Sequence, residues 1–125
     1  MTAWTSDELE AIGGADELRI GALRPDGTPR SLVTIWVVRV GDGLYARAYK
    51  AAGSPWYRGV QATHRGRVEA GGVTKDVTFT DETDPAVRDA VDAAYRDKYR
   101  SYDASYVEPM VAETARDATI KLVPR

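Results

Sequence analysis

Two cationic side chains, Arg47 and Lys50, lie on either side of Tyr49 where an alternating segment of the sequence ends. The alternation over Leu44–Lys50 predicts a β-strand, on which Arg47 and Tyr49 share a face and Lys50 occupies the end. The next four residues (51–54) are small and leave backbone amides accessible. Cationic side chains beside free amides are suited to binding phosphate, so this strand end is the first candidate site.

Two aromatic residues, Trp56 and Tyr57, follow the small residues, and Arg58 adds a third cation. They belong to a short helix predicted over residues 56–63, which starts near Pro55 and would attract an anion to its N-terminus. Large flat side chains of this kind can cover a planar ring. A phosphate joined to a planar heterocycle would fit the set. The other interpretation is an ordinary solvated strand end.

The positive charge of the chain is concentrated in its middle. Residues 44–75 contain six lysine or arginine residues and one glutamate, although the whole chain has a net charge of −2. A basic segment inside an acidic chain favours a local anionic ligand over a surface coated by nucleic acid. The alternative is a solvated basic face that pairs with the acidic C-terminal third.

Most other catalytic chemistry is excluded by composition. The sequence has no cysteine and one histidine, which rules out thiolate catalysis, disulfides and a multi-histidine metal site. The histidine, His64, is predicted to lie on the surface. Asp81, Glu82 and Asp84 stand where a helix begins, and we interpret them as stabilising its N-terminus rather than as an acid–base pair.

The longest apolar run, Leu32–Val38, is too short to span a membrane. The N-terminus also lacks the basic and then apolar profile of a signal peptide. We therefore expect a cytoplasmic protein with no membrane or nucleic-acid partner.

The 125 residues predict a single domain, 1–125. An N-terminal helix begins with a capping box formed by Thr5 and Glu8. Periodicity then predicts six strands, at residues 18–24, 30–40, 44–50, 67–70, 73–80 and 118–123. Short strands joined mostly by tight turns predict a mainly β fold with flanking helices, a closed six-stranded antiparallel β-barrel.

A longer helix is predicted from Asp84, its capping residue, to about Tyr102. Its tyrosines have 4-3-4 spacing, which predicts a packing face against the barrel. These tyrosines are Tyr95, Tyr99, Tyr102 and Tyr106. We expect Tyr99 to be buried, and Lys98 to lie in solvent.

The predicted strand at residues 30–40 is apolar on both faces in its middle, around Ile35, Trp36 and Val37. A strand buried on both sides fits a barrel wall whose outer face meets another molecule. The sequence therefore predicts a homodimer.

Three segments together resemble the split-barrel flavoproteins, the pyridoxamine-phosphate-oxidase-like and deazaflavin-dependent nitroreductase-like families. The segments are the strand Thr28–Val38, which begins with Thr-Pro-Arg and is followed by Gly-Asp-Gly, the strand that ends in Tyr49 and Lys50, and the sequence Pro-Trp-Tyr at residues 55–57. The chain as a whole is most similar to a bacterial branch of this superfamily with no assigned function.

The resemblance implies a six-stranded split barrel, a homodimer, and FMN or a deazaflavin as cofactor in an oxidoreductase that acts on a small organic molecule. It places Lys50 at the cofactor phosphate and Trp56 and Tyr57 beside the ring. The predicted cofactor-binding set is Thr34, Trp36, Arg47, Tyr49, Lys50, Trp56, Tyr57 and Arg58. Because Tyr49 and Arg58 depart from the deazaflavin motif, the alternative is a split barrel without a cofactor that binds a small ligand or a protein.

Overall fold

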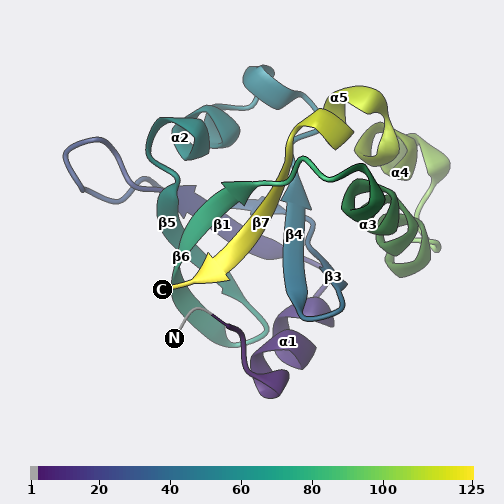
Figure 1. Cartoon of the computed structure of the whole chain (residues 1–125), viewed down its shortest axis with the longest axis horizontal. Coiled ribbons are helices and arrows are strands. Elements are labelled where there is room, and N and C mark those ends of the chain that lie inside the picture. Colours follow the sequence, from purple (N-terminus) through teal and green to yellow (C-terminus); the bar gives the residue numbers. More distant parts are fainter. Residues whose placement is uncertain (1–2) are drawn as a thin grey trace.

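The strands form where apolar residues alternate with polar ones, and they assemble into one antiparallel sheet (Figure 1). The computed structural model describes residues 3–125. Its strands are β1 (Leu18–Ala22), β2 (Val33–Ile35), β3 (Val38–Val40), β4 (Gly43–Arg47), β5 (Arg65–Ala70), β6 (Val73–Asp81) and β7 (Thr119–Pro124). Their order across the sheet is β2-β1-β5-β6-β7-β4-β3. The predicted mainly β fold with flanking helices is confirmed.

The sheet curls into a split barrel rather than the closed barrel that strand spacing predicted, because its two edge strands, β2 and β3, are not paired with each other. These two strands are consecutive in the chain and separated only by Trp36 and Val37. The sequence predicted one strand over residues 30–40. The structure divides it in two, so the sheet has seven strands rather than six. Burial of this segment is also uneven, because Val37 and Val38 are fully buried whereas Val33 is 39% exposed.

The break between β2 and β3 is held by side chains of the following helical region. The amide of Val37 donates a hydrogen bond to the Tyr99 hydroxyl at 3.2 Å, and this hydroxyl lies 2.6 Å from the carbonyl oxygen of Asp16. Lys98 Nζ donates to the carbonyl oxygens of Val37 at 2.6 Å and Ala15 at 2.5 Å. The backbone groups of Val37 are therefore satisfied without a partner strand.

Lys98 does not lie in solvent, as the sequence predicted. Its side chain is half-buried because the α3 face that carries it packs over the β2–β3 break. Burial lowers the pKa of Lys98 to about 8, and the nearby Asp16 carboxylate opposes this shift. The lysine was assigned to the surface because helix periodicity alone does not show that a barrel strand ends beneath it.

The helices are α1 (Ser6–Gly13), α2 (Pro55–Thr63), α3 (Pro85–Lys98), α4 (Ala104–Val111) and α5 (Glu113–Asp117), with a 3₁₀ turn, η1 (Ala51–Gly53). Helices α1, α3 and α4 begin at residues whose side chains cap them. The capping box of Thr5 and Glu8 is present at α1. Asp84 caps α3 as predicted. Pro55 opens α2 at a position where its missing N–H costs no helical hydrogen bond.

The predicted long helix is shorter than expected, and a separate helix follows it. α3 ends at Lys98 rather than near Tyr102, and Asp103 caps α4 by accepting a hydrogen bond from the Ser105 amide. Helices α4 and α5 were not predicted. Tyr99 is fully buried, as expected, whereas Tyr106 lies on α4 and is 64% exposed. The tyrosine spacing therefore does not describe one continuous packing face.

Strand β4 is buried on both faces, and this burial determines which side chains at its end can reach the candidate site. Leu44 and Ala46 point into the barrel, where Leu44 pairs with Leu122 of β7. Tyr45 belongs to a second core between the sheet and helices α3 and α4. Because side chains alternate along a strand, Arg47 lies on the same face as Tyr45, under the helices.

Helices α3, α4 and α5 gather on the side of β3 and β4, while α2 and α1 lie at opposite ends of the barrel (Figure 1). The chain leaves the end of β4 through the η1 turn, which leads directly into α2. Within residues 3–125, no helix combines the length and the apolar composition needed to cross a membrane.

Candidate ligand-binding cavity

A cavity of about 750 Å³ opens at the end of β4. Its walls come from residues 33–36, 47–50 and 53–56 and from α4 between residues 105 and 110. Cofactor and small-molecule sites in proteins typically have this volume. Of the predicted set, the cavity brings together Thr34, Trp36, Arg47, Tyr49, Lys50 and Trp56.

One end of the cavity is polar and cationic. Lys50 is exposed there, with Nζ 5.5 Å from the centre of the Tyr49 ring. Within residues 3–125, Lys50 forms no ion pair. Ser54 precedes α2, and its hydroxyl makes no capping bond to the helix. A free ammonium, a free hydroxyl and a helix N-terminus converge at this end, where they can bind an anion.

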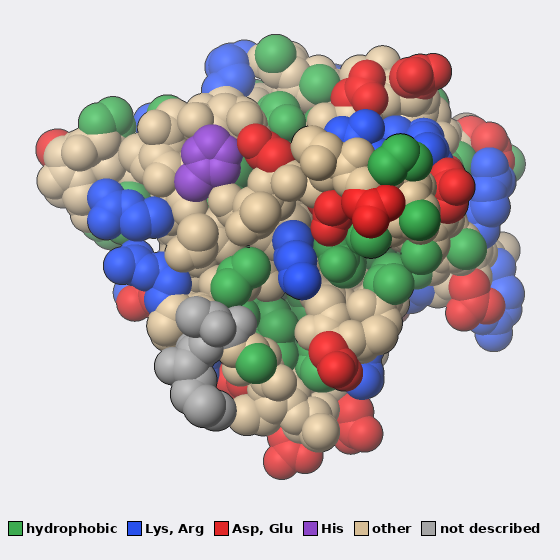
Figure 2. All heavy atoms as spheres, viewed as in Figure 1, with side chains coloured by type: hydrophobic (Ala, Val, Ile, Leu, Met, Phe, Trp, Pro, Cys, Tyr) green, Lys and Arg blue, Asp and Glu red, His purple; other side chains and the backbone are tan. Residues whose placement is uncertain are grey.

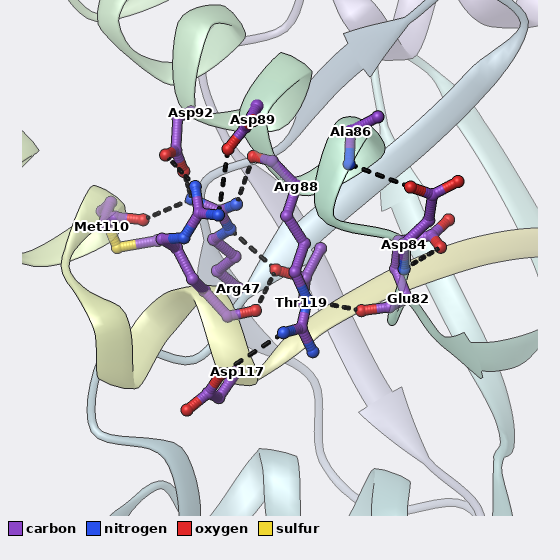
Figure 3. Close-up of polar contacts among 11 residues, drawn as sticks. Arg47, Glu82, Asp84, Ala86, Arg88, Asp89, Asp92, Met110, Asp117 and Thr119 are labelled. Atoms are coloured by element: carbon purple, nitrogen blue, oxygen red, sulfur yellow. Dashed lines mark hydrogen bonds and ion pairs between the residues drawn. The ribbon is translucent and has the colours of Figure 1, made fainter.

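Arg47, which the sequence predicted as a second phosphate ligand, lines the cavity but has its guanidinium bonded to other protein groups. The residue is 2% exposed, and its guanidinium binds groups from three other elements, α3, α4 and β7 (Figure 3). It donates to Asp92 Oδ1 at 2.5 Å, to Thr119 Oγ1 at 2.9 Å, and to the carbonyl oxygens of Met110 and Arg88, each at 2.9 Å. The helices cover this face of β4, so Arg47 ties the cavity wall together instead of facing a ligand.

Other charges extend this network outward over α3 and α5. Arg116 contacts Asp92 and also pairs with Asp89 at 3.0 Å, and Arg88 pairs with Asp117 at 3.3 Å. Figure 2 shows acidic and basic side chains interspersed on the surface of this helical region. The positive charge of Arg47 and its neighbours is thus neutralised locally, and among residues 3–125 Lys50 is the unpaired cation that lines the cavity.

The other walls of the cavity are aromatic and apolar. Trp36 lies parallel to Tyr99, with ring centres 3.8 Å apart and planes 5° apart. Trp56 reaches the cavity from the first turn of α2, and Tyr106 comes from α4. These side chains enclose a space suited to a flat ring.

Two residues of the predicted set lie outside the cavity lining. Tyr57 packs against the barrel core, where burial raises the pKa of its hydroxyl. Arg58 donates a hydrogen bond to the carbonyl oxygen of Ala52 at 2.7 Å and so holds the η1 turn. Both residues follow Trp56 on α2, and the helical rotation of about 100° per residue turns them away from the cavity.

The wall formed by α4 is the part of the cavity that the sequence did not reveal. Ser105, Pro109 and Met110 line it together with Tyr106. The tyrosine spacing had placed Tyr106 on the packing face of the preceding helix, and Pro109 inside α4 obscured the helical pattern there.

The other titratable groups behave as structural residues. His64 is partly exposed and lies 3.4 Å from Asp81 Oδ2, while Gln61 donates to Asp81 Oδ1 at 2.8 Å. Asp84 caps α3. In the part of the chain that the structure describes, histidine and carboxylate side chains form no group that could hold a metal ion.

The chain shares its fold with several solved proteins, and the predicted resemblance to the split-barrel flavoproteins is confirmed at the level of fold. An F420-H2 dependent reductase is 17% identical and has a TM-score of 0.62; the match covers 86% of this chain and 93% of the reductase. An FAD-binding protein from Mesorhizobium loti is 17% identical, with a TM-score of 0.60 and coverage of 98% and 91%. A conserved hypothetical protein from Mycobacterium tuberculosis is 13% identical, with a TM-score of 0.65 and coverage of 99% and 81%. These identities establish a common fold.

Within this fold class, the chain belongs to a bacterial family described as "Uncharacterized protein conserved in bacteria" (DUF2255), which matches residues 8–122. None of the curated proteins compared with the chain matches it. The family description adds no activity, so the function has to be argued from the cavity.

Proposed function

We propose that the protein binds a flavin-type cofactor, FMN or a deazaflavin, in the cavity at the end of β4 and acts as an oxidoreductase on a small organic molecule. The observation that carries this proposal is the pairing of a cationic, hydroxyl-bearing end at Lys50 and Ser54 with aromatic walls at Trp36 and Trp56. Two of the structural neighbours are named for FAD and for F420, a flavin and a deazaflavin.

The donor set fits such a cofactor. The phosphate end would lie at Lys50 and Ser54, near the N-terminus of α2, and the ring would lie beside Trp56. A flavin or deazaflavin supplies hydride transfer, and the protein supplies position and electrostatics. The protein therefore requires no acid–base dyad of its own, consistent with the structural roles of His64 and Asp84.

The second candidate function is a cofactor-free module that binds a small ligand or a protein partner. The observation in its favour is that Arg47 is occupied by protein groups, which leaves one free cation at the phosphate end.

Lys50→Ala is expected to weaken cofactor binding about ten- to a hundredfold, because a charge-assisted contact contributes roughly 1.5–3 kcal/mol. Fluorescence titration of the apo-protein with FMN, and separately with a deazaflavin, measures the affinity. Arg19→Ala is the control, because Arg19 lies on β1 and pairs with Glu69 at 3.1 Å. It should leave the affinity unchanged.

Two outcomes would contradict the proposal in different ways. If neither ligand binds below about millimolar concentration, where the binding free energy is only about −4 kcal/mol, the cofactor-free function takes its place. If one ligand binds and Lys50→Ala leaves its affinity unchanged, the cofactor is right and the placement of its phosphate is wrong.

We also propose that the protein acts as a homodimer. Apolar and aromatic side chains stay exposed at the cavity mouth, with Val33 39% and Tyr106 64% exposed. A surface of this kind usually marks an interaction site. Light scattering at micromolar concentration should give twice the 13.7 kDa mass of the chain, and a monomer would contradict the proposal.

A further inference from the structure

We propose that the uncovered face of Trp36 is a stacking surface for the substrate, and that the substrate is an uncharged planar aromatic or heteroaromatic molecule. The redox role of such a molecule rests on the function proposed above, whereas its binding to Trp36 can be measured separately. The observations that carry the inference are the ring geometry at Trp36, its rigid support, and the charges of the cavity around it.

Trp36 has one covered face and borders the cavity. Tyr99 lies parallel to it at 3.8 Å between ring centres. Tyr102 makes an edge-to-face contact with Trp36, with the ring centres 5.1 Å apart and the planes at 69°. A parallel contact this close leaves no room for a ligand on that side. Trp36 also lines the cavity, so the face opposite Tyr99 is the one left for a ring bound there, and offset stacking on that face is favourable.

The support behind Trp36 is rigid. Tyr99 is fully buried, and its hydroxyl bonds to the backbone of Val37 and Asp16. Lys98 holds the carbonyl of the same Val37. The indole is thus fixed before any ligand arrives, which reduces the entropy lost on binding. Tyr99 acts here as a positioning residue, because it touches Trp36 and not the ligand.

The charges of the cavity define the substrate class. Its two charged lining residues are Arg47, which is neutralised by Asp92, and Lys50, which we assign to the cofactor phosphate. The remaining lining side chains are apolar, aromatic or hydroxyl-bearing, and Pro109 and Met110 form an apolar wall. A charged substrate would lose its hydration without gaining an opposite charge. An uncharged ring bearing a hydroxyl or carbonyl group would not lose free energy in this way.

The experiment compares two probes of similar size, 2-naphthol and its saturated analogue decahydro-2-naphthol, which has no flat aromatic face. The chain has three tryptophans, at positions 4, 36 and 56, so the indole N–H signals of the ¹⁵N-labelled protein number three and can be assigned with single Trp→Phe variants. Trp4 is an internal reference, since its Nε1 donates to the Leu122 carbonyl oxygen at 2.9 Å in the core.

We expect 2-naphthol to shift the Trp36 signal saturably, with the Trp4 signal unchanged, and to bind at least about tenfold more tightly than the saturated analogue. Trp36→Phe, which keeps a flat ring, should retain affinity within a few-fold. Trp36→Leu should lose about tenfold, measured by calorimetry. Tyr99→Phe keeps the ring that supports Trp36 but removes the hydroxyl, and should increase the motion of the Trp36 indole in ¹⁵N relaxation.

Equal binding of the two probes, or a shift confined to Trp56, would overturn the inference. Repeating the 2-naphthol titration on protein loaded with FMN separates the test of this inference from the test of the proposed function. A persistent Trp36 shift supports a substrate subsite, whereas displacement of FMN by 2-naphthol would assign Trp36 to the cofactor ring and contradict the inference. If FMN does not bind but 2-naphthol still shifts Trp36, the redox proposal fails and the aromatic-ring site stands.

Discussion

Arg47→Met should lower the free energy of unfolding by about 3 kcal/mol or more, as removal of one partner from a buried ion pair does. The guanidinium is fully buried, and its loss leaves the Arg88 and Met110 carbonyl oxygens without their donors. Asp92 retains Arg116 as a partner, which limits the cost. Urea denaturation measures the change.

The matched control is Arg67→Met, the same substitution in an exposed ion pair. Arg67 and Asp76 lie 3.3 Å apart, and their side chains are 54% and 63% exposed. Such pairs contribute about 0–1 kcal/mol. Equal losses for the two variants would show that the Arg47 network does not stabilise the fold.

The Arg47 variant also separates the two interpretations of this residue. If Arg47 only holds the wall of the cavity, then under conditions where Arg47→Met is folded its affinity for FMN should fall less than that of Lys50→Ala. An equal or larger fall would restore Arg47 as a direct phosphate ligand, as the sequence first suggested.

Tyr99→Ala should cost about 3–5 kcal/mol, the range found when large aromatic core residues are truncated. The ring is completely buried between the sheet and α3, and it supports Trp36 from behind. Its loss also leaves the Val37 amide without its acceptor. Tyr99→Phe should cost about 1–3 kcal/mol, because only the hydroxyl is removed and the buried amide loses its partner.

Tyr106→Ala provides the comparison, since Tyr106 belongs to the same series of tyrosines but is 64% exposed. Exposed substitutions usually change stability by less than about 0.5 kcal/mol. Denaturation midpoints that coincide for Tyr99→Ala and Tyr106→Ala would show that the buried face of this region is misassigned.

Features set by neighbouring residues could be predicted from the sequence. The capping box of Thr5 and Glu8, the Asp84 cap of α3 and the alternation of β4 all depend on residues within a few positions of one another. The strand end near Lys50 was found in the same way, because small and cationic residues adjoin there. Most of the barrel and one end of the cavity follow from such local signals.

Features set by distant contacts could not be predicted. The break at Val37 depends on Tyr99, which lies 62 residues later in the chain. The hydrogen bonds of the Arg47 guanidinium depend on Asp92 and Met110, which lie 45 and 63 residues away. A strand pattern over residues 44–50 predicts that Arg47 shares a face with Tyr49, but β4 ends at Arg47 and Tyr49 lies in the turn that follows. The pattern also does not show that helices cover Arg47. Direct phosphate binding by Arg47 was therefore a reasonable inference with no local pattern to oppose it.

The order of strands has a consequence for how the protein is made. β7 is the last strand in the sequence, yet it lies between β6 and β4 and bonds to both. Until residues 119–124 leave the ribosome, the β3–β4 hairpin has no strand connecting it to β5 and β6. The barrel therefore forms only after residues 119–124 have been synthesised, and until then the edges of β4 and β6 that pair with β7 are exposed to chaperones or to other nascent chains.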